Sequence, residues 1–281
     1  MNSIIKIYKY LTQTMDAPTN FGAYHIACIV AVILLSLICA ALLRNKSDRA
    51  INKFTVSLWA LLVVLEVYKQ LIYGFDLVGA SLNWDYAWYA FPFQFCSSPL
   101  YILPIIAFTK KEKVRDACIA YMMSFSFFAG LAVFCYPNDV FTSTIGINLQ
   151  TMIHHGSQIL FGIVFAARYR EKMNMKFFLR GVSVFVVMSA VAMILNHYVY
   201  QIFLTVGIDE TFNMFYISPY FDCTLPVLSV VYDKVSYPVF LVIYLLGFVV
   251  AARIAFCILG KITSVEEKSS YEIEKNAMYA K

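Results

Sequence analysis

The chain has 281 residues, of which 61% are hydrophobic and only 14% are charged. An ordinary soluble domain is about 45–50% apolar and about 25% charged, so this composition excludes most soluble classes. The net charge of +5 does not indicate a nucleic-acid-binding protein, because the Lys and Arg residues form short separate clusters between apolar runs. We therefore expect an integral membrane protein that binds no nucleic acid.

A membrane-spanning helix needs about 20 mostly apolar residues. Seven stretches approach this length: residues 21–43, 54–73, 91–108, 117–136, 151–167, 182–203 and 237–260. The sequence therefore predicts an all-α, polytopic membrane protein whose seven transmembrane helices form one domain over residues 21–260.

The charges between these stretches predict the orientation of the chain. Lys and Arg cluster at residues 44–53, 110–115 and 168–180, after the first, third and fifth stretches. The alternate connections are mostly acidic. Because cytoplasmic loops are enriched in Lys and Arg, the amino terminus is expected outside and the carboxyl terminus inside the cell (plasma) membrane.

The two ends of the chain differ from the apolar domain. Apolar residues near the start follow helical spacing, which predicts that residues 1–20 contain a short amphipathic helix on the outer membrane surface. Residues 261–281 are rich in Glu, Lys and Ser and are expected to form a mobile or weakly helical cytoplasmic tail.

Polar residues are rare in the spans, and each one is energetically costly there, by about 2.5–3.5 kcal/mol for an ionisable group. Glu66 and Lys69, spaced i to i+3, can form an ion pair on one helix face. Counted from the expected outer helix ends at about 1.5 Å per residue, the polar groups fall in one shallow outer layer. They are Glu66, Lys69, Gln94, Cys96, His154, His155, Asn196 and His197.

Cys96 and a histidine in this layer are the elements of nucleophilic catalysis. An imidazole that removes the thiol proton produces the reactive thiolate, and a carboxylate or amide such as Glu66 or Asn196 can orient the imidazole. Such a site would transfer acyl groups between lipids through a thioester. The plainer interpretation also remains open: a packing cysteine, hydrogen-bonded histidines and a neutralised ion pair.

Several segments resemble the YwaF-like integral membrane proteins and their eukaryotic relative, transmembrane protein 164. The resemblance covers about residues 20–260 and is strongest at residues 91–98 (FPFQFCSS), at Glu66, at His155 with Gly156 and at Asn196. It implies a cysteine-dependent phospholipid acyltransferase in which Cys96 carries the acyl group and His155 is its base. Glu66 and Asn196 would then be orienting residues.

One departure from the family pattern affects this assignment. Many members have a histidine two residues before the motif cysteine, where this chain has Gln94. If that histidine is the base, the fold is retained here and the activity is lost or altered. A non-catalytic lipid-binding protein therefore stays an alternative, as does a small-molecule or proton-coupled transporter lined by Glu66, Lys69, His155 and His197, although the inner halves of the spans are almost wholly apolar.

The remaining expectations concern cysteines and one long loop. The seven cysteines form no CxxC pair, so neither a zinc site nor another metal site is predicted, and no cofactor is expected. Cys223 could pair with Cys135 near the outer surface. Loop 204–236 is long and rich in aromatic residues, so it either folds over the site or lies on the membrane interface.

Overall fold

The structure is a computed structural model that describes residues 3–138 and 140–279, with side chains described as far as residue 263. It is mostly helical (73%). The helices are α1 Ser3–Leu11, α2 Ala23–Leu43, α3 Asp48–Ile72, α4 Pro99–Phe108, α5 Glu112–Tyr121, α6 Phe127–Cys135, α7 Ile145–Arg168, α8 Met175–Val206, α9 Leu228–Tyr232 and α10 Tyr237–Tyr279. Strands β1 Phe75–Val78 and β2 Ser81–Trp84 form an antiparallel hairpin after α3.

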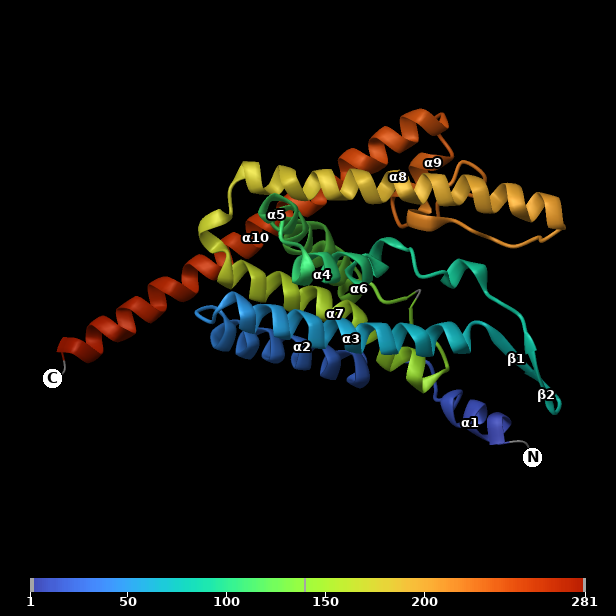
Figure 1. Ribbon diagram of the computed structural model, residues 1–281, viewed down its shortest axis with the longest axis horizontal. Helices are drawn as coiled ribbons and strands as arrows, with labels where there is room; N and C mark the ends of the chain where they lie inside the picture. Colours follow the sequence, from blue (N-terminus) through green and yellow to red (C-terminus); the bar gives the residue numbers. More distant parts are fainter. Residues whose placement is uncertain (1–2, 139, 280–281) are drawn as a thin grey trace.

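The helices pack as two groups with a shared centre (Figure 1). Helices α2, α3 and α7 run side by side, and α8 lies on the opposite side of the molecule, where it contacts α5. Helices α4 to α6 fill the space between the groups, and α10 crosses the bundle and extends beyond it. The hairpin and α1 lie at the end of the bundle opposite to this extension.

Five helical segments are long and apolar enough to cross a membrane: α2, α3, the continuous helix Glu112–Cys135, α8 and the first part of α10. This confirms a polytopic helical membrane protein. The other two expected spans differ from these five, since Phe95–Phe108 is short and α7 is more polar and largely buried inside the bundle. The seven-span arrangement and its orientation therefore stay predictions.

The third expected span begins later than its apolar sequence indicates. Residues 91–94 are not helical, Phe95–Ser97 form a 3₁₀ turn, and α4 starts only at Pro99. Proline at the first position favours a helix start because its missing N–H and fixed φ suit that position. Cys96 therefore lies in a turn before the helix, and not in the continuous helix that was expected over residues 91–108.

Helix α7 also departs from its expected limits, in the other direction. It begins at Ile145, so His154 and His155 lie in the middle of a helix rather than at its first turn. The apolar pattern missed this first part because it contains Asn148 and Gln150, which are both buried in the bundle. Counting from the apolar boundary consequently underestimated how far the histidines lie from the helix start.

The two chain ends are both helical. Near the amino terminus, where an amphipathic helix was expected, the chain forms α1. This helix is held at the hairpin end by hydrogen bonds from Tyr8 Oη to the Phe75 carbonyl and from Tyr68 Oη to the Leu11 carbonyl. Its position on the membrane surface stays a prediction. At the other end the described backbone of α10 continues as a helix to Tyr279, and the mobility expected for this tail stays a prediction.

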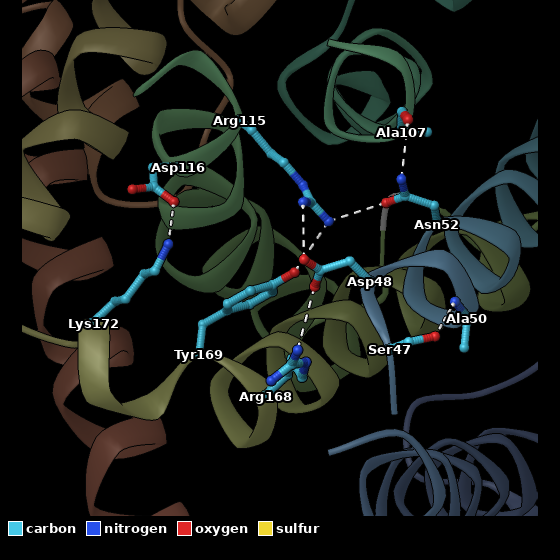
Figure 2. Close-up of polar contacts among 10 residues, drawn as sticks. All are labelled: Ser47, Asp48, Ala50, Asn52, Ala107, Arg115, Asp116, Arg168, Tyr169 and Lys172. Atoms are coloured by element: carbon cyan, nitrogen blue, oxygen red, sulfur yellow. Dashed lines mark hydrogen bonds and ion pairs between the residues drawn. The ribbon is translucent and has the colours of Figure 1, made fainter. Parts of the chain in front are cut away.

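An ion-pair network joins α3, α5, α7 and α8 at the opposite end of the bundle. Figure 2 shows the pairs of Asp48 and the pair of Asp116 with Lys172. Asp116 of α5 accepts hydrogen bonds from Lys172 Nζ at 2.8 Å and Arg180 Nη1 at 2.7 Å. Asp48 at the start of α3 pairs with Arg168 at 3.3 Å and with Arg115 at 3.8 Å. The basic clusters recognised in the sequence therefore partly neutralise the buried Asp116 and the exposed Asp48 where four helices meet.

We expect Asp116→Ala to destabilise the protein more than the matched change Asp48→Ala. The Asp116 side chain is 13% exposed and makes two short ion pairs, whereas that of Asp48 is 59% exposed and makes longer ones. Partly exposed pairs contribute up to about 1 kcal/mol each, so Asp116→Ala should lower the free energy of unfolding by about 1–2 kcal/mol. Thermal unfolding in detergent measures this, and equal losses from both variants would contradict it.

Candidate functional site

Cys96 is held in place through its backbone carbonyl. His154 Nε2 lies 2.9 Å from the Cys96 carbonyl oxygen, and Gln158 Nε2 donates to the same oxygen at 2.5 Å. Because a carbonyl oxygen can only accept, the His154 Nε2 atom carries the ring proton. One face of α7 therefore binds the turn that presents the thiol.

The ion pair on α3 lies at the same site. Lys69 Nζ and Glu66 Oε1 are 2.8 Å apart, which confirms the pair expected from their spacing. Gln70 Nε2 also donates to Glu66 Oε1, at 2.7 Å. Helix α3 packs against both α4 and α7. The structure thus brings residues of α3, α7 and the turn before α4 together.

The two histidine rings lie beside one another, with centroids 5.6 Å apart. His155 Nδ1 is 2.7 Å from the Thr151 carbonyl oxygen, so Nδ1 carries the proton and Nε2 is an acceptor. By the same reasoning, His154 Nδ1 is an acceptor. Neither of these nitrogens has a hydrogen-bond partner among the described residues, so the Cys96 thiol does not donate to His155 in this structure.

Further unpartnered acceptors lie in this cluster. Glu66 Oε2 and Gln158 Oε1 are both buried and lack a hydrogen-bond partner within the described part of the chain. With the two ring nitrogens, they make four buried acceptors on α3 and α7 that have no partner among the described residues. Buried polar atoms normally have partners, so this arrangement suits a ligand or reacting group that donates hydrogen bonds.

The remaining predicted residues serve a different purpose. Gln94 Nε2 donates to the Asn213 carbonyl at 3.1 Å, and Gln94 Oε1 accepts from Phe215 N at 3.0 Å. Asn196 in α8 binds both backbone groups of Met214, at 2.7 and 3.0 Å. Neither side chain orients a histidine. The polar residues expected in one layer therefore form two groups: a site around Cys96, and a clamp in which Gln94 and Asn196 bind the backbone of residues 213–215.

His197 belongs to neither group. Its side chain is exposed, and its Nδ1 lies 2.5 Å from Tyr220 Oη, on the outer side of α8. It was expected in the same polar layer as His154 and His155, and its hydrogen bond with Tyr220 joins it instead to the loop after α8. It follows Asn196 by one residue, and neighbouring positions on a helix point in different directions.

The clamped segment folds back against the turn that holds Cys96. Phe215 packs on Phe93 and Phe95, with ring centroids 5.8 and 5.6 Å apart. Phe215 and Tyr216 have φ values of 60° and 56°, which non-glycine residues adopt only when surrounding contacts hold them there. Of the two positions expected for the long loop, the structure thus shows the one in which it folds over the site.

Sequence reasoning missed Gln158, Ser98 and Tyr121. Gln158 follows His154 by four residues, so both lie on one face of α7, and that spacing was the available signal. Tyr121 Oη donates to Ser98 Oγ at 2.9 Å, next to a π-helical turn at Met122–Ser126. Such turns are rare and are common near functional sites, but an apolar sequence does not reveal them.

The expected pairing of Cys135 with Cys223 is wrong. Both are free cysteines, and Cys223 is buried in the returning loop while Cys135 is exposed at the end of α6. Proximity to the outer surface was the basis of that expectation, and it does not determine which side chains face each other.

We expect Asn196→Ala to loosen the loop over the site. The change leaves the N–H and carbonyl of Met214 buried without partners, which costs about 1–3 kcal/mol for each unsatisfied group. Limited proteolysis should then cut residues 207–227 faster than in the parent protein. The control is Ile194→Ala, on the exposed side of the same helix, and equal cleavage of both variants would argue against the clamp.

The family comparison agrees with the architecture and with the position of the motif. The model of the TMEM164 family matches residues 20–260 of this chain, which include all the elements of the site. Comparisons with curated proteins and with solved structures give no match. Because the family match covers most of the sequence and the structure is a helical multi-pass membrane protein, the chain belongs to the TMEM164 family.

Proposed function

We propose that this protein transfers acyl groups between membrane phospholipids through a thioester on Cys96. One observation carries the proposal: His154, Gln158 and the Glu66–Lys69 pair converge on the turn that presents this thiol. Imidazole acceptors and a cation are groups of the kind that activate a cysteine thiol as a thiolate.

The reaction requires two acyl transfers and no change of oxidation state. In the first, His155 Nε2 takes the thiol proton, and the Cys96 sulfur attacks the ester carbonyl carbon of the donor lipid. The ester C–O bond breaks, and the leaving oxygen takes the proton back from the imidazolium. In the second, the acceptor's hydroxyl attacks the thioester, His155 takes the hydroxyl proton and returns it to the thiolate that leaves.

The neighbouring groups have distinct tasks in this scheme. His155 is the base because its Nδ1 bond to Thr151 fixes Nε2 as an unpartnered acceptor. His154 and Gln158 are positioning residues that hold the Cys96 backbone. Lys69 contributes the positive charge that stabilises the thiolate and the developing oxyanion, and Glu66 holds Lys69 in place.

The presence of Gln94, where many family members have a histidine, is compatible with the proposed mechanism. Its amide is fully used on the loop at residues 213–215, away from the imidazole acceptors. The position that is a histidine in many family members therefore holds the loop in this chain. His155 takes the role of base without it.

The proposed topology places the site in the outer leaflet of the cell membrane, with seven spans, the amino terminus outside and the carboxyl terminus inside. The three basic loops support this orientation. In a bacterial host, green fluorescent protein fused after residue 281 should fluoresce, and alkaline phosphatase fused at that point should be inactive. The reverse pair of results would refute the orientation.

The thioester is tested by Cys96→Ser and Cys96→Ala. The purified parent protein in liposomes should acquire a hydroxylamine-sensitive label from a phospholipid with an alkyne-tagged acyl chain. Both variants should lose this label and the transfer to an acceptor lipid, because no sulfur remains to form the thioester. The matched control is Cys39→Ala in α2, which should label like the parent. Parent-like turnover by both Cys96 variants would refute the mechanism.

The variants His155→Gln and His154→Gln test which of the two histidines is the general base. Loss of a general base lowers the rate by about 10²–10⁴-fold, and we expect this for His155→Gln. His154→Gln keeps an amide donor for the Cys96 carbonyl and should retain most of the rate. The opposite order of effects would make His154 the base.

A further inference from the structure

A cavity of about 560 Å³ opens beside the Glu66–Lys69 pair, between α3, α4 and the β-hairpin. Val63, Val67 and Leu71 line it from α3, and Leu100 and Tyr101 line it from α4. The lining positions on α3 run from Val63 to Leu71, and the eight steps between them span about 12 Å of helix. The cavity is therefore an elongated groove along α3, of a size typical for small-molecule sites.

The mouth of the groove faces the surface that would contact lipid. Val67 is 55% exposed and Leu71 is 45% exposed, although both line the groove. Their neighbours on the outer face of α3, Leu61 and Val64, are also exposed and apolar. A groove that opens on an apolar, membrane-spanning face meets hydrocarbon rather than water.

One part of the groove wall is polar. Tyr86 Oη donates to Gln70 Oε1 at 2.5 Å, and Gln70 Nε2 donates to Glu66 Oε1 at 2.7 Å. Burial and the negative charge of Glu66 raise the pKa of Tyr86 to about 12, so its hydroxyl remains a donor at neutral pH. This chain uses Glu66 Oε1 and leaves Glu66 Oε2 without a partner among the described residues.

The chemistry of the groove therefore specifies an amphiphile. Its apolar length suits a hydrocarbon chain, and the incompletely satisfied carboxylate suits an N–H or O–H donor. A headgroup without such a donor would leave Glu66 Oε2 unpartnered, which is unfavourable for a buried acceptor. Charge complementarity favours an ammonium or a hydroxyl over a phosphate at this position.

The geometry points to a lipid site in this groove, which holds one hydrocarbon chain of a membrane lipid and places a hydrogen-bond donor of its headgroup at Glu66. This inference rests on the proposed function, since it supplies the route by which a lipid reaches Cys96. Pro92 and Leu100, which line the groove, flank Cys96 in the sequence by four residues on each side. A lipid in the groove would thus lie against the segment that carries the thiol.

Photolabelling of the Cys96→Ser protein in phosphatidylcholine liposomes tests the site without requiring turnover. The probes carry a diazirine in the middle of one acyl chain, and cross-links are mapped by mass spectrometry. We expect them to concentrate on residues 63–71 and 100–101. Cross-links spread evenly over all lipid-facing helices would overturn the inference.

A matched pair of variants on one helix face separates the groove from the surrounding surface. Val67→Trp fills the groove and should reduce labelling about tenfold, which corresponds to a loss of about 1.4 kcal/mol in affinity. Val64→Trp adds the same ring on the exposed face outside the groove and should label like the parent. Leu71→Phe is a second groove variant, for use if Val67→Trp lowers the thermal stability. Equal labelling of all of these variants would overturn the site.

Probes with three different headgroups test whether a hydrogen-bond donor of the lipid binds Glu66. Probes with an ethanolamine headgroup supply an ammonium, diacylglycerol probes supply a hydroxyl, and choline probes supply neither. At least one donor probe should label several-fold more than the choline probe, and the stronger one identifies the donor. Equal labelling by all three would overturn the assignment of the donor to Glu66.

The photolabelling and thioester experiments distinguish an error in the lipid-site inference from an error in the proposed acyl transfer. Concentrated labelling of Cys96→Ser, combined with no thioester in the parent protein, would support the lipid site and refute acyl transfer. A thioester in the parent protein, combined with evenly spread labelling, would leave acyl transfer standing and refute the groove.

Discussion

The structure depends on hydrogen bonds to the backbone of residues 91–98, the part of the third apolar segment that is not helical. In an apolar environment an unpaired carbonyl or N–H is costly, so a break in a helix at that depth needs partners from neighbouring elements. His154 and Gln158 provide them for the Cys96 carbonyl, through two hydrogen bonds from one face of α7. The thiol is therefore presented from a turn whose position is determined by the most buried helix of the bundle.

This requirement divides the polar residues into two sets. Gln94 and Asn196 use all of their described hydrogen bonds on the backbone of residues 213–215 and hold the returning loop. His154 and His155 each use one ring nitrogen on a carbonyl and keep the other as an acceptor. The first set stabilises the fold, and the second retains capacity for chemistry. The proposed thioester mechanism uses only the second set.

The two ends of the bundle are stabilised in different ways. At one end, ion pairs of Asp48 and Asp116 join four helices. At the other, aromatic residues of the hairpin and the loop pack around the site and its groove, as in the stacked pair Trp84 and Tyr86. Rigid pairing at the first end is compatible with lipid exchange at the second, because apolar contacts impose fewer directional constraints than ion pairs.

The sequence by itself determined the protein class, the approximate positions of most helices and the Glu66–Lys69 pair, because apolar length and helical spacing are local properties of the chain. It also predicted that Cys96 lies close to a histidine of α7. Only the tertiary structure decided that α4 begins after Cys96, that His154 rather than His155 contacts the Cys96 backbone, and that Gln94 and Asn196 bind a loop. These features depend on which groups of distant segments satisfy each other's hydrogen bonds, and neither apolar periodicity nor residue spacing carries that information.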